Sequence, residues 1–87
     1  MGRAGLRKRV RRMVLNWTVV PESNDENGVP GLWAAEPEKG KFIWIEREVD
    51  GFAVIAPDAQ TVLKMCKTWA SALRWVTMHI VEIMMEG

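Results

Sequence analysis

Residues 41–56 read KFIWIEREVDGFAVIA, and this stretch decides the fold. Two runs rich in β-branched and aromatic residues flank Asp50-Gly51, a dipeptide that predicts a two-residue hairpin turn between antiparallel strands. A turn of fixed length also fixes the register of the strands, because it determines which residues face one another. The predicted cross-strand pairs are Val49 with Phe52, Arg47 with Val54, and Ile45 with Ala56.

Turn residues on both sides extend this hairpin into a meander. Pro57-Asp58-Ala59-Gln60 predicts a turn into a further strand over residues 61–66. On the other side, Pro37-Glu38-Lys39-Gly40 predicts a turn that follows a strand over residues 32–36. The sheet is therefore expected to contain three or four antiparallel strands.

These registers give the predicted sheet two faces of different chemistry, because side chains alternate along a strand. They also place Trp33 opposite Trp44. The core face is apolar apart from Arg47, and its members are Leu32, Ala34, Ile43, Ile45, Val49, Phe52, Val54, Ala56, Leu63 and Met65. The second face is aromatic and acidic, and its members are Trp33, Ala35, Phe42, Trp44, Glu46, Glu48, Ile55, Val62 and Lys64.

A C-terminal helix is predicted from Thr68, as the N-cap, to about Met85, because a threonine side chain accepts a free N–H at a helix start. Apolar residues recur along it at helical spacing and form one stripe that should cover the core face. The stripe consists of Trp69, Ala72, Leu73, Val76, Ile80 and Ile83. The predicted fold class is thus α+β: a three- to four-stranded antiparallel meander sheet, packed by one C-terminal helix and preceded by a basic N-terminal arm.

The size and composition fit one domain. Eighty-seven residues, 48% of them hydrophobic and 26% charged, are enough for a single core, and no apolar run approaches the length of a membrane span. We assign residues 1–14 to a basic amphipathic arm and residues 15–87 to the folded domain, with a flexible loop over 22–31. The single cysteine, Cys66, excludes an intrachain disulfide and fits a reducing, cytoplasmic setting.

Charge is divided unevenly along the chain. Residues 1–12 carry six basic groups and no acid, whereas residues 13–87 carry a net charge of −5. The basic groups are Arg3, Arg7, Lys8, Arg9, Arg11 and Arg12. In a helix they would oppose an apolar stripe of Leu6, Val10, Met13 and Trp17.

Several interpretations of this arm stay open. Such a segment suits a phosphate backbone, an anionic lipid or an acidic protein groove. Alternatively it folds back on Glu46 and Glu48 of the second sheet face, or it is disordered. A further alternative is that Met13 is the true first residue.

The second side of the predicted helix is also apolar. Trp75, Met78, Val81 and Met85 lie opposite the core stripe. They predict a contact with another copy or with a partner protein, because Met and Trp are common at adaptable interfaces. The alternative is that an N-terminal strand over residues 15–20, or the arm, covers this side.

Catalytic groups are few. His79 is the only histidine and has only Glu82 as an obvious partner, and Cys66 lacks an accompanying base. The sequence contains no Gly-rich phosphate loop and no metal-ligand spacing. We therefore expect no enzymatic activity, no metal and no cofactor.

Residues 42–80 combine three antiparallel strands with a helix that starts Lys67-Thr68-Trp69-Ala70-Ser71-Ala72. This order and the strand-Thr-x-x-x-Ala junction resemble the arm-type DNA-binding domains of tyrosine recombinases and the plant AP2 domain, which place their sheet in the major groove. Those domains carry Arg and Lys on the outer sheet face. Here Glu46, Glu48 and aromatic residues stand there with only Lys64 positive, so no binding residue is transferred. In style the chain is also similar to phage accessory proteins with a Trp-rich sheet and a single helix.

Two functions follow as expectations. The first is a non-enzymatic protein-interaction module that self-associates and binds or inhibits a protein partner. Its predicted interface residues are Trp75, Met78, Val81, Met85, Trp33, Phe42 and Trp44. The alternative is a non-specific nucleic-acid-binding protein that acts through the six basic groups of the arm. The net charge of −5 over residues 13–87 opposes polyanions, so this second function depends on the arm alone.

Overall fold

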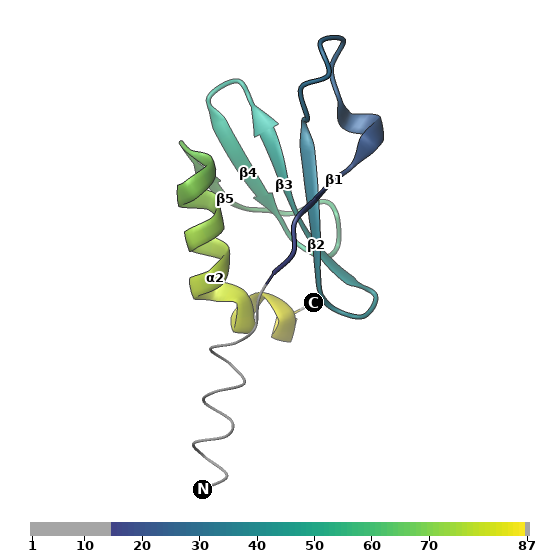
Figure 1. The fold of residues 1–87 in the computed structure, drawn as a ribbon. Helices are drawn as coiled ribbons and strands as arrows, with labels where there is room; N and C mark the ends of the chain where they lie inside the picture. The colour runs from purple at the N-terminus through teal and green to yellow at the C-terminus, as the bar shows by residue number, and fades with distance from the viewer. Residues whose placement is uncertain (1–14, 87) are drawn as a thin grey trace, which may run out of the picture.

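The computed structural model describes residues 15–86, so the arm predicted over residues 1–14 lies outside the described part. Five antiparallel strands form one sheet in the order β1-β2-β3-β4-β5, and a single helix covers one of its faces (Figure 1). The elements are β1 (Thr18–Val19), the 3-10 helix η1 (Pro21–Ser23), β2 (Leu32–Glu38), β3 (Lys41–Glu48), β4 (Gly51–Ile55), β5 (Val62–Cys66) and α2 (Trp69–Glu86). The α+β class and the meander are confirmed. The strand number is higher than predicted, because the short β1 joins the edge of β2.

The β3–β4 hairpin forms at the predicted place but with a register two residues away from the predicted one. Glu48 pairs with Gly51, Arg47 with Phe52, and Ile45 with Val54. The prediction was wrong because the loop is Val49-Asp50, with Val49 fully exposed, while Gly51 belongs to the strand. A shift of two residues keeps the paired side chains of β3 and β4 on their predicted faces, whereas Val49, predicted on the core face, lies in the loop. Ile43, Ile45 and Val54 are accordingly buried under α2.

β2 is displaced by one residue from its predicted register, and its two faces are exchanged as a result. Trp33 pairs with Ile45 and Ala34 with Trp44, so the predicted Trp33–Trp44 pair is wrong. The reason lies near Pro37, which sits inside β2 at an irregularity between Ala35 and Glu38 rather than in the turn. Proline is tolerated at such positions because no ladder N–H is needed there. Trp33 and Ala35 therefore face α2, and Leu32 and Ala34 face away.

β5 also departs from the predicted register, because the β4–β5 ladder shifts between Val54 and Ile55. Met65 pairs with Ala53 and is 49% exposed, so its assignment to the core was wrong. Leu63 packs against the core as predicted. Cys66 pairs with Phe52 and is buried in the core cluster.

The core lies between the sheet and α2, and the predicted helical stripe is confirmed. Ala72, Val76, Ile80 and Ile83 are buried, while Trp69 and Leu73 pack against them at the margin. At one end of the core four aromatic rings meet. The ring centroids of Trp33 and Trp69 are 4.5 Å apart, Phe52 lies 5.8 Å from Trp69, and Trp17 lies 6.2 Å from Trp69. This aromatic cluster fixes the start of α2 against the sheet.

The loop predicted over 22–31 is held by hydrogen bonds around Asp25 and Arg47. Asp25 Oδ1 accepts the N–H of Val29 at 2.9 Å, and this bond is the main reason why the pKa of Asp25 lies below its ordinary value. Arg47 Nε donates to the carbonyl of Pro30 at 2.9 Å, and its guanidinium lies 3.5 Å from Asp25 Oδ2. These bonds accommodate the one charged residue that interrupts the predicted core face. The flexibility of this loop stays a prediction.

We expect Thr68→Ala to lower the free energy of unfolding by about 1 kcal/mol, because Thr68 Oγ1 accepts the N–H of Ser71 at 3.0 Å and caps α2. Urea denaturation followed by circular dichroism measures this loss. Thr77→Ala is the matched control, since Thr77 bonds the carbonyl of Leu73 within the helix and removing that bond does not uncap it. Equal losses in the two variants would contradict the capping role.

Candidate interaction surfaces

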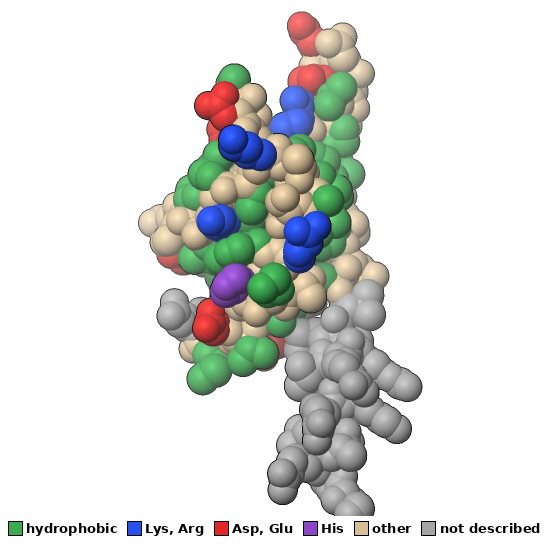
Figure 2. All heavy atoms as spheres, turned by 90° about the vertical axis from the view of Figure 1, so that its left-hand side faces the viewer, with side chains coloured by type: hydrophobic (Ala, Val, Ile, Leu, Met, Phe, Trp, Pro, Cys, Tyr) green, Lys and Arg blue, Asp and Glu red, His purple; other side chains and the backbone are tan. Residues whose placement is uncertain are grey.

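The outermost side of α2 carries an exposed apolar stripe. Met78 is 71% exposed, Val81 51% and Met85 81%. Their spacing of three and four residues places them on one side of the helix, and Arg74, also exposed, precedes Met78 by four residues on the same side. We call these four residues the outer stripe. Figure 2 views the molecule from this side and shows apolar side chains among separate basic and acidic groups.

Trp75 was predicted to belong with these residues but has a different role. It is half-buried and packs against the core cluster. Its ring stacks on His79 with centroids 4.2 Å apart and an interplanar angle of 23°. His79 Nδ1 lies 2.9 Å from the carbonyl oxygen of Trp75, a contact in which Nδ1 carries the proton and donates it. Trp75 thus forms a flank between the core and the outer stripe.

A second apolar surface covers the side of the sheet that faces away from α2. In the described part of the chain no element lies over this side (Figure 1). Phe42 and Trp44 stack there with centroids 5.9 Å apart, Val62 is 53% exposed and Met65 is 49% exposed. We call this the outer sheet face, and its apolar members are Leu32, Ala34, Phe42, Trp44, Ala53, Ile55, Val62 and Met65. A sheet that is apolar on both faces normally buries both, so this face is a candidate docking surface.

The charge on the outer sheet face is negative. Glu46 and Glu48 stand on it, and none of the strand residues described on this face is Lys or Arg. The prediction of Lys64 on this face was wrong, because Lys64 pairs with Val54, which faces α2. Partial burial, together with the neighbouring Glu48 carboxylate, raises the pKa of Glu46 above its ordinary value. The face therefore favours a partner that is both apolar and cationic.

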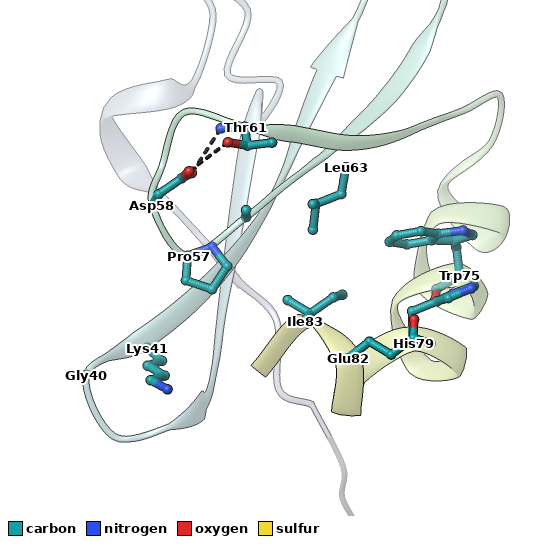
Figure 3. A pocket seen from close by; sticks show the side chains of 11 residues that line it. Gly40, Lys41, Pro57, Asp58, Thr61, Leu63, Trp75, His79, Glu82 and Ile83 are labelled. Atoms are coloured by element: carbon teal, nitrogen blue, oxygen red, sulfur yellow. Dashed lines mark hydrogen bonds between the residues drawn. The ribbon is translucent and has the colours of Figure 1, made fainter. Parts of the chain in front are cut away.

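A cavity of about 490 Å³ opens between the start of β3, the β4–β5 turn and the second half of α2 (Figure 3). Several of its polar lining groups form hydrogen bonds or ion pairs within the chain. The Asp58 carboxylate accepts the hydroxyl of Thr61 at 2.6 Å and two backbone N–H groups, and these bonds lower the pKa of Asp58. Lys41 Nζ lies 3.7 Å from Glu38 Oε1 and 3.4 Å from the carbonyl of Met84. Thr61 and Asp58 thus hold the β4–β5 turn together through hydrogen bonds to each other.

Two further findings concern catalysis and membranes. Within residues 15–86, no three His, Cys, Asp or Glu side chains are grouped closely enough to hold a metal ion. Cys66, the candidate nucleophile, is buried in the core. Among the helices of the described part, none is both long and apolar enough to cross a membrane. The expected lack of enzymatic activity stays a prediction.

The structure divides the predicted interface residues into three groups. Met78, Val81 and Met85 lie together on the outer stripe, and Phe42 and Trp44 lie together on the outer sheet face. Trp33 and Trp75 belong to neither surface, because Trp33 packs under α2 against Trp69 and Trp75 packs against the core cluster. Leu32, Ala34 and Met65 were missed as members of the outer sheet face, and the proline within β2 was the signal that could have placed the first two. The predicted nucleic-acid residues of the arm lie outside the described part.

Comparisons with protein-family models, with curated proteins and with solved structures find no match to this chain.

Proposed function

We propose that this protein is a non-enzymatic protein-interaction module that associates with a second copy of itself through the outer stripe of α2. The observation that carries the proposal is the exposure of Met78, Val81 and Met85, at 71%, 51% and 81%, on one side of a single helix. Burial of apolar surface favours association by about 25 cal/mol per Å². Three such side chains in one row therefore favour a helix-to-helix contact.

The charges of α2 favour an antiparallel pairing. Arg74 and Glu82 lie near opposite ends of the outer stripe, on exposed positions of the helix. A two-fold axis between antiparallel helices brings the first half of one beside the second half of the other, so Arg74 of each copy approaches Glu82 of its partner. A parallel pairing would instead set Arg74 beside Arg74, and like charges repel. The spacing of four, three and four residues from Arg74 to Met85 is that of an interdigitating helical seam.

Charge also favours a protein partner over nucleic acid. Residues 13–87 carry a net charge of −5. Two of their acidic groups, Glu46 and Glu48, stand on the outer sheet face. A polyanion is repelled by such a body. The nucleic-acid alternative therefore depends on the basic residues of the arm alone.

We expect Met78→Glu combined with Val81→Glu to convert a dimer into a monomer, because association would bury unpaired carboxylates in an apolar contact. Sedimentation velocity at tens of micromolar protein measures the change, and circular dichroism checks that the helix is retained. Thr77→Glu is the matched control, since Thr77 is exposed on the same helix but off the stripe. It should leave the dimer intact.

Charge exchange tests the antiparallel arrangement itself. Arg74→Glu should weaken association, and adding Glu82→Arg to it should restore association, because the two residues face each other across the axis. A wild-type protein that sediments as a monomer at high micromolar concentration would disprove the proposed self-association. A dimer that none of these substitutions weakens would place the contact elsewhere.

A further inference from the structure

We infer that the outer sheet face is a docking site for the chain's own N-terminal segment, residues 1–14, whose apolar side chains would meet Phe42 and Trp44 while its cations meet Glu46 and Glu48. This site lies on the side of the sheet opposite α2, so the inference goes beyond the proposed self-association. It rests on four properties of the described residues, namely the uncovered face, its acidic charge, the place where the described chain begins, and the length of β3.

Within residues 15–86, no element forms a second layer over the outer sheet face. Trp44 and Ile55 are half-buried by their neighbours alone, and Val62 and Met65 are 53% and 49% exposed. A sheet face of this composition is usually packed by a helix or another sheet. A helix is about 10 Å across with its side chains, which matches two strand spacings of about 4.8 Å. One amphipathic helix laid along β3 would therefore cover the Phe42–Trp44 stack.

Among residues 15–86, no cation forms an ion pair with the acidic groups of this face. The two ion pairs found in the described part join Lys41 to Glu38 and Arg47 to Asp25, and neither involves Glu46 or Glu48. Partial burial, and after it the neighbouring Glu48 carboxylate, raise the pKa of Glu46 above its ordinary value. A basic segment docked there would neutralise both.

The N-terminal segment has the complementary composition. It contains six cations and no acid, and Leu6, Val10 and Met13 recur at spacings of four and three residues. In a helix these three side chains would share one side. An apolar stripe bordered by Arg and Lys matches an apolar face bordered by Glu.

The chain enters at the correct end of the sheet. Thr18 of β1 pairs with Ala34 in antiparallel orientation, so the residues before Thr18 run towards the end of β2 at Glu38. β3 begins beside that end, with Lys41 paired to Glu38 and Phe42 next in sequence. The described chain therefore begins, at Leu15, at the end of the sheet where β3 starts, and the side chains of Leu15 and Trp17 pack against the core on the α2 side. Residues 1–14 would have to pass around the edge of the sheet to reach the outer sheet face.

The lengths also agree. As a helix, residues 1–11 would span about 16 Å, which leaves residues 12–14 to pass around the edge of the sheet. The six steps from Phe42 to Glu48 along β3 span about 20 Å. A helix laid back along β3 from the Phe42 end would place Val10 over the aromatic stack. Arg3 and Arg7 would then lie beside the carboxylates.

Paramagnetic relaxation in the full-length chain tests this docking. A nitroxide is attached at Lys8→Cys in a Cys66→Ala background, and nuclear magnetic resonance signals are compared before and after reduction of the nitroxide. We expect a loss of intensity at the Trp44 indole N–H and at the amides of Ile55 and Val62. The Val81 amide on the far side of α2 should be unaffected.

Charge reversal provides the matched comparison. Glu46→Lys with Glu48→Lys should restore the outer-face signals, whereas Glu22→Lys with Glu26→Lys, on exposed acids outside the sheet, should not. Arg7→Glu with Arg11→Glu should also restore them, and this variant leaves every residue of the folded body unchanged. Sharp outer-face signals in the nitroxide-labelled protein would overturn the inference and leave the segment available to nucleic acid. A mixed sample of nitroxide-labelled chains and chains without a nitroxide provides a further check. If the nitroxide broadens only the signals of other chains, docking within one chain is overturned.

Discussion

Replacing Trp33 by alanine is expected to lower the free energy of unfolding by about 3–5 kcal/mol. Trp33 lies on the α2 side of the sheet, where its ring is 4.5 Å from Trp69 and 6.1 Å from Phe52. Removal of the indole leaves a cavity at the point where α2 starts, and the rigid rings around it fill that space poorly. Small domains have total stabilities of about 5–15 kcal/mol, so this loss removes a large share of the total.

Trp44→Ala is the comparison that makes the Trp33 result informative. Trp44 lies on the opposite side of the sheet and stacks on one aromatic neighbour, Phe42. It has no contact with the core cluster under α2, so we expect a smaller loss than for Trp33. Urea denaturation followed by circular dichroism suits both variants, because tryptophan fluorescence changes with either substitution. A greater loss for Trp44→Ala would contradict the placement of the two indoles on opposite faces.

The fold class could be predicted because two periodic patterns are strong. The alternation in residues 41–56 identifies the central hairpin, and the stripe from Trp69 to Ile83 identifies the helix and the side it buries. The hairpin register was wrong by two residues, yet Ile43, Ile45 and Val54 are buried as expected. An even shift leaves each side chain on its face, so the prediction of the core tolerated this error.

The prediction of the sheet faces failed in β2, where a shift of one residue decides which side chains face α2. Pro37 fits a turn equally well by composition, but the chain keeps it in β2 and makes the turn at Lys39-Gly40. That difference of one residue moves Trp33 into the core and Leu32 out of it. β1 was difficult to predict for another reason. Thr18 and Val19 form a strand only by pairing with β2. Such pairing depends on tertiary structure and leaves little local pattern.

The candidate surfaces could likewise be predicted only in part from the sequence. Helical periodicity alone places Met78, Val81 and Met85 on one side, and the structure confirms that they are exposed. The cavity between Lys41, Asp58 and His79 has no sequence signal, because it joins residues from three distant parts of the chain. The identity of a partner is a property of another surface, so periodicity can indicate where binding occurs but cannot name what binds.

Gly51→Ala is expected to destabilise the protein by roughly 2–5 kcal/mol, through two effects that act together. Gly51 has a φ of +150°, a conformation that residues with a side chain rarely adopt. A methyl group there would also collide with the carbonyl oxygen of Cys66 and approach the Lys67 Cα to 3.1 Å. These are backbone atoms, so relief requires β4 and β5 to separate. Strain at a positive φ costs about 1–2 kcal/mol and overpacking about 1–3 kcal/mol.

Gly40→Ala separates the two effects. Gly40 has a φ of +83°, but a methyl group there would meet no atom within 4 Å, so only the conformational strain of about 1–2 kcal/mol applies. Urea denaturation should therefore give a clearly larger loss for Gly51→Ala than for Gly40→Ala, and equal losses would show that the β4–β5 approach is not tight. Cys66 and Lys67 lead directly into Thr68, the cap of α2. The methyl group at position 51 should consequently perturb the resonances of the first turn of α2, whereas the methyl group at position 40 should leave them unchanged.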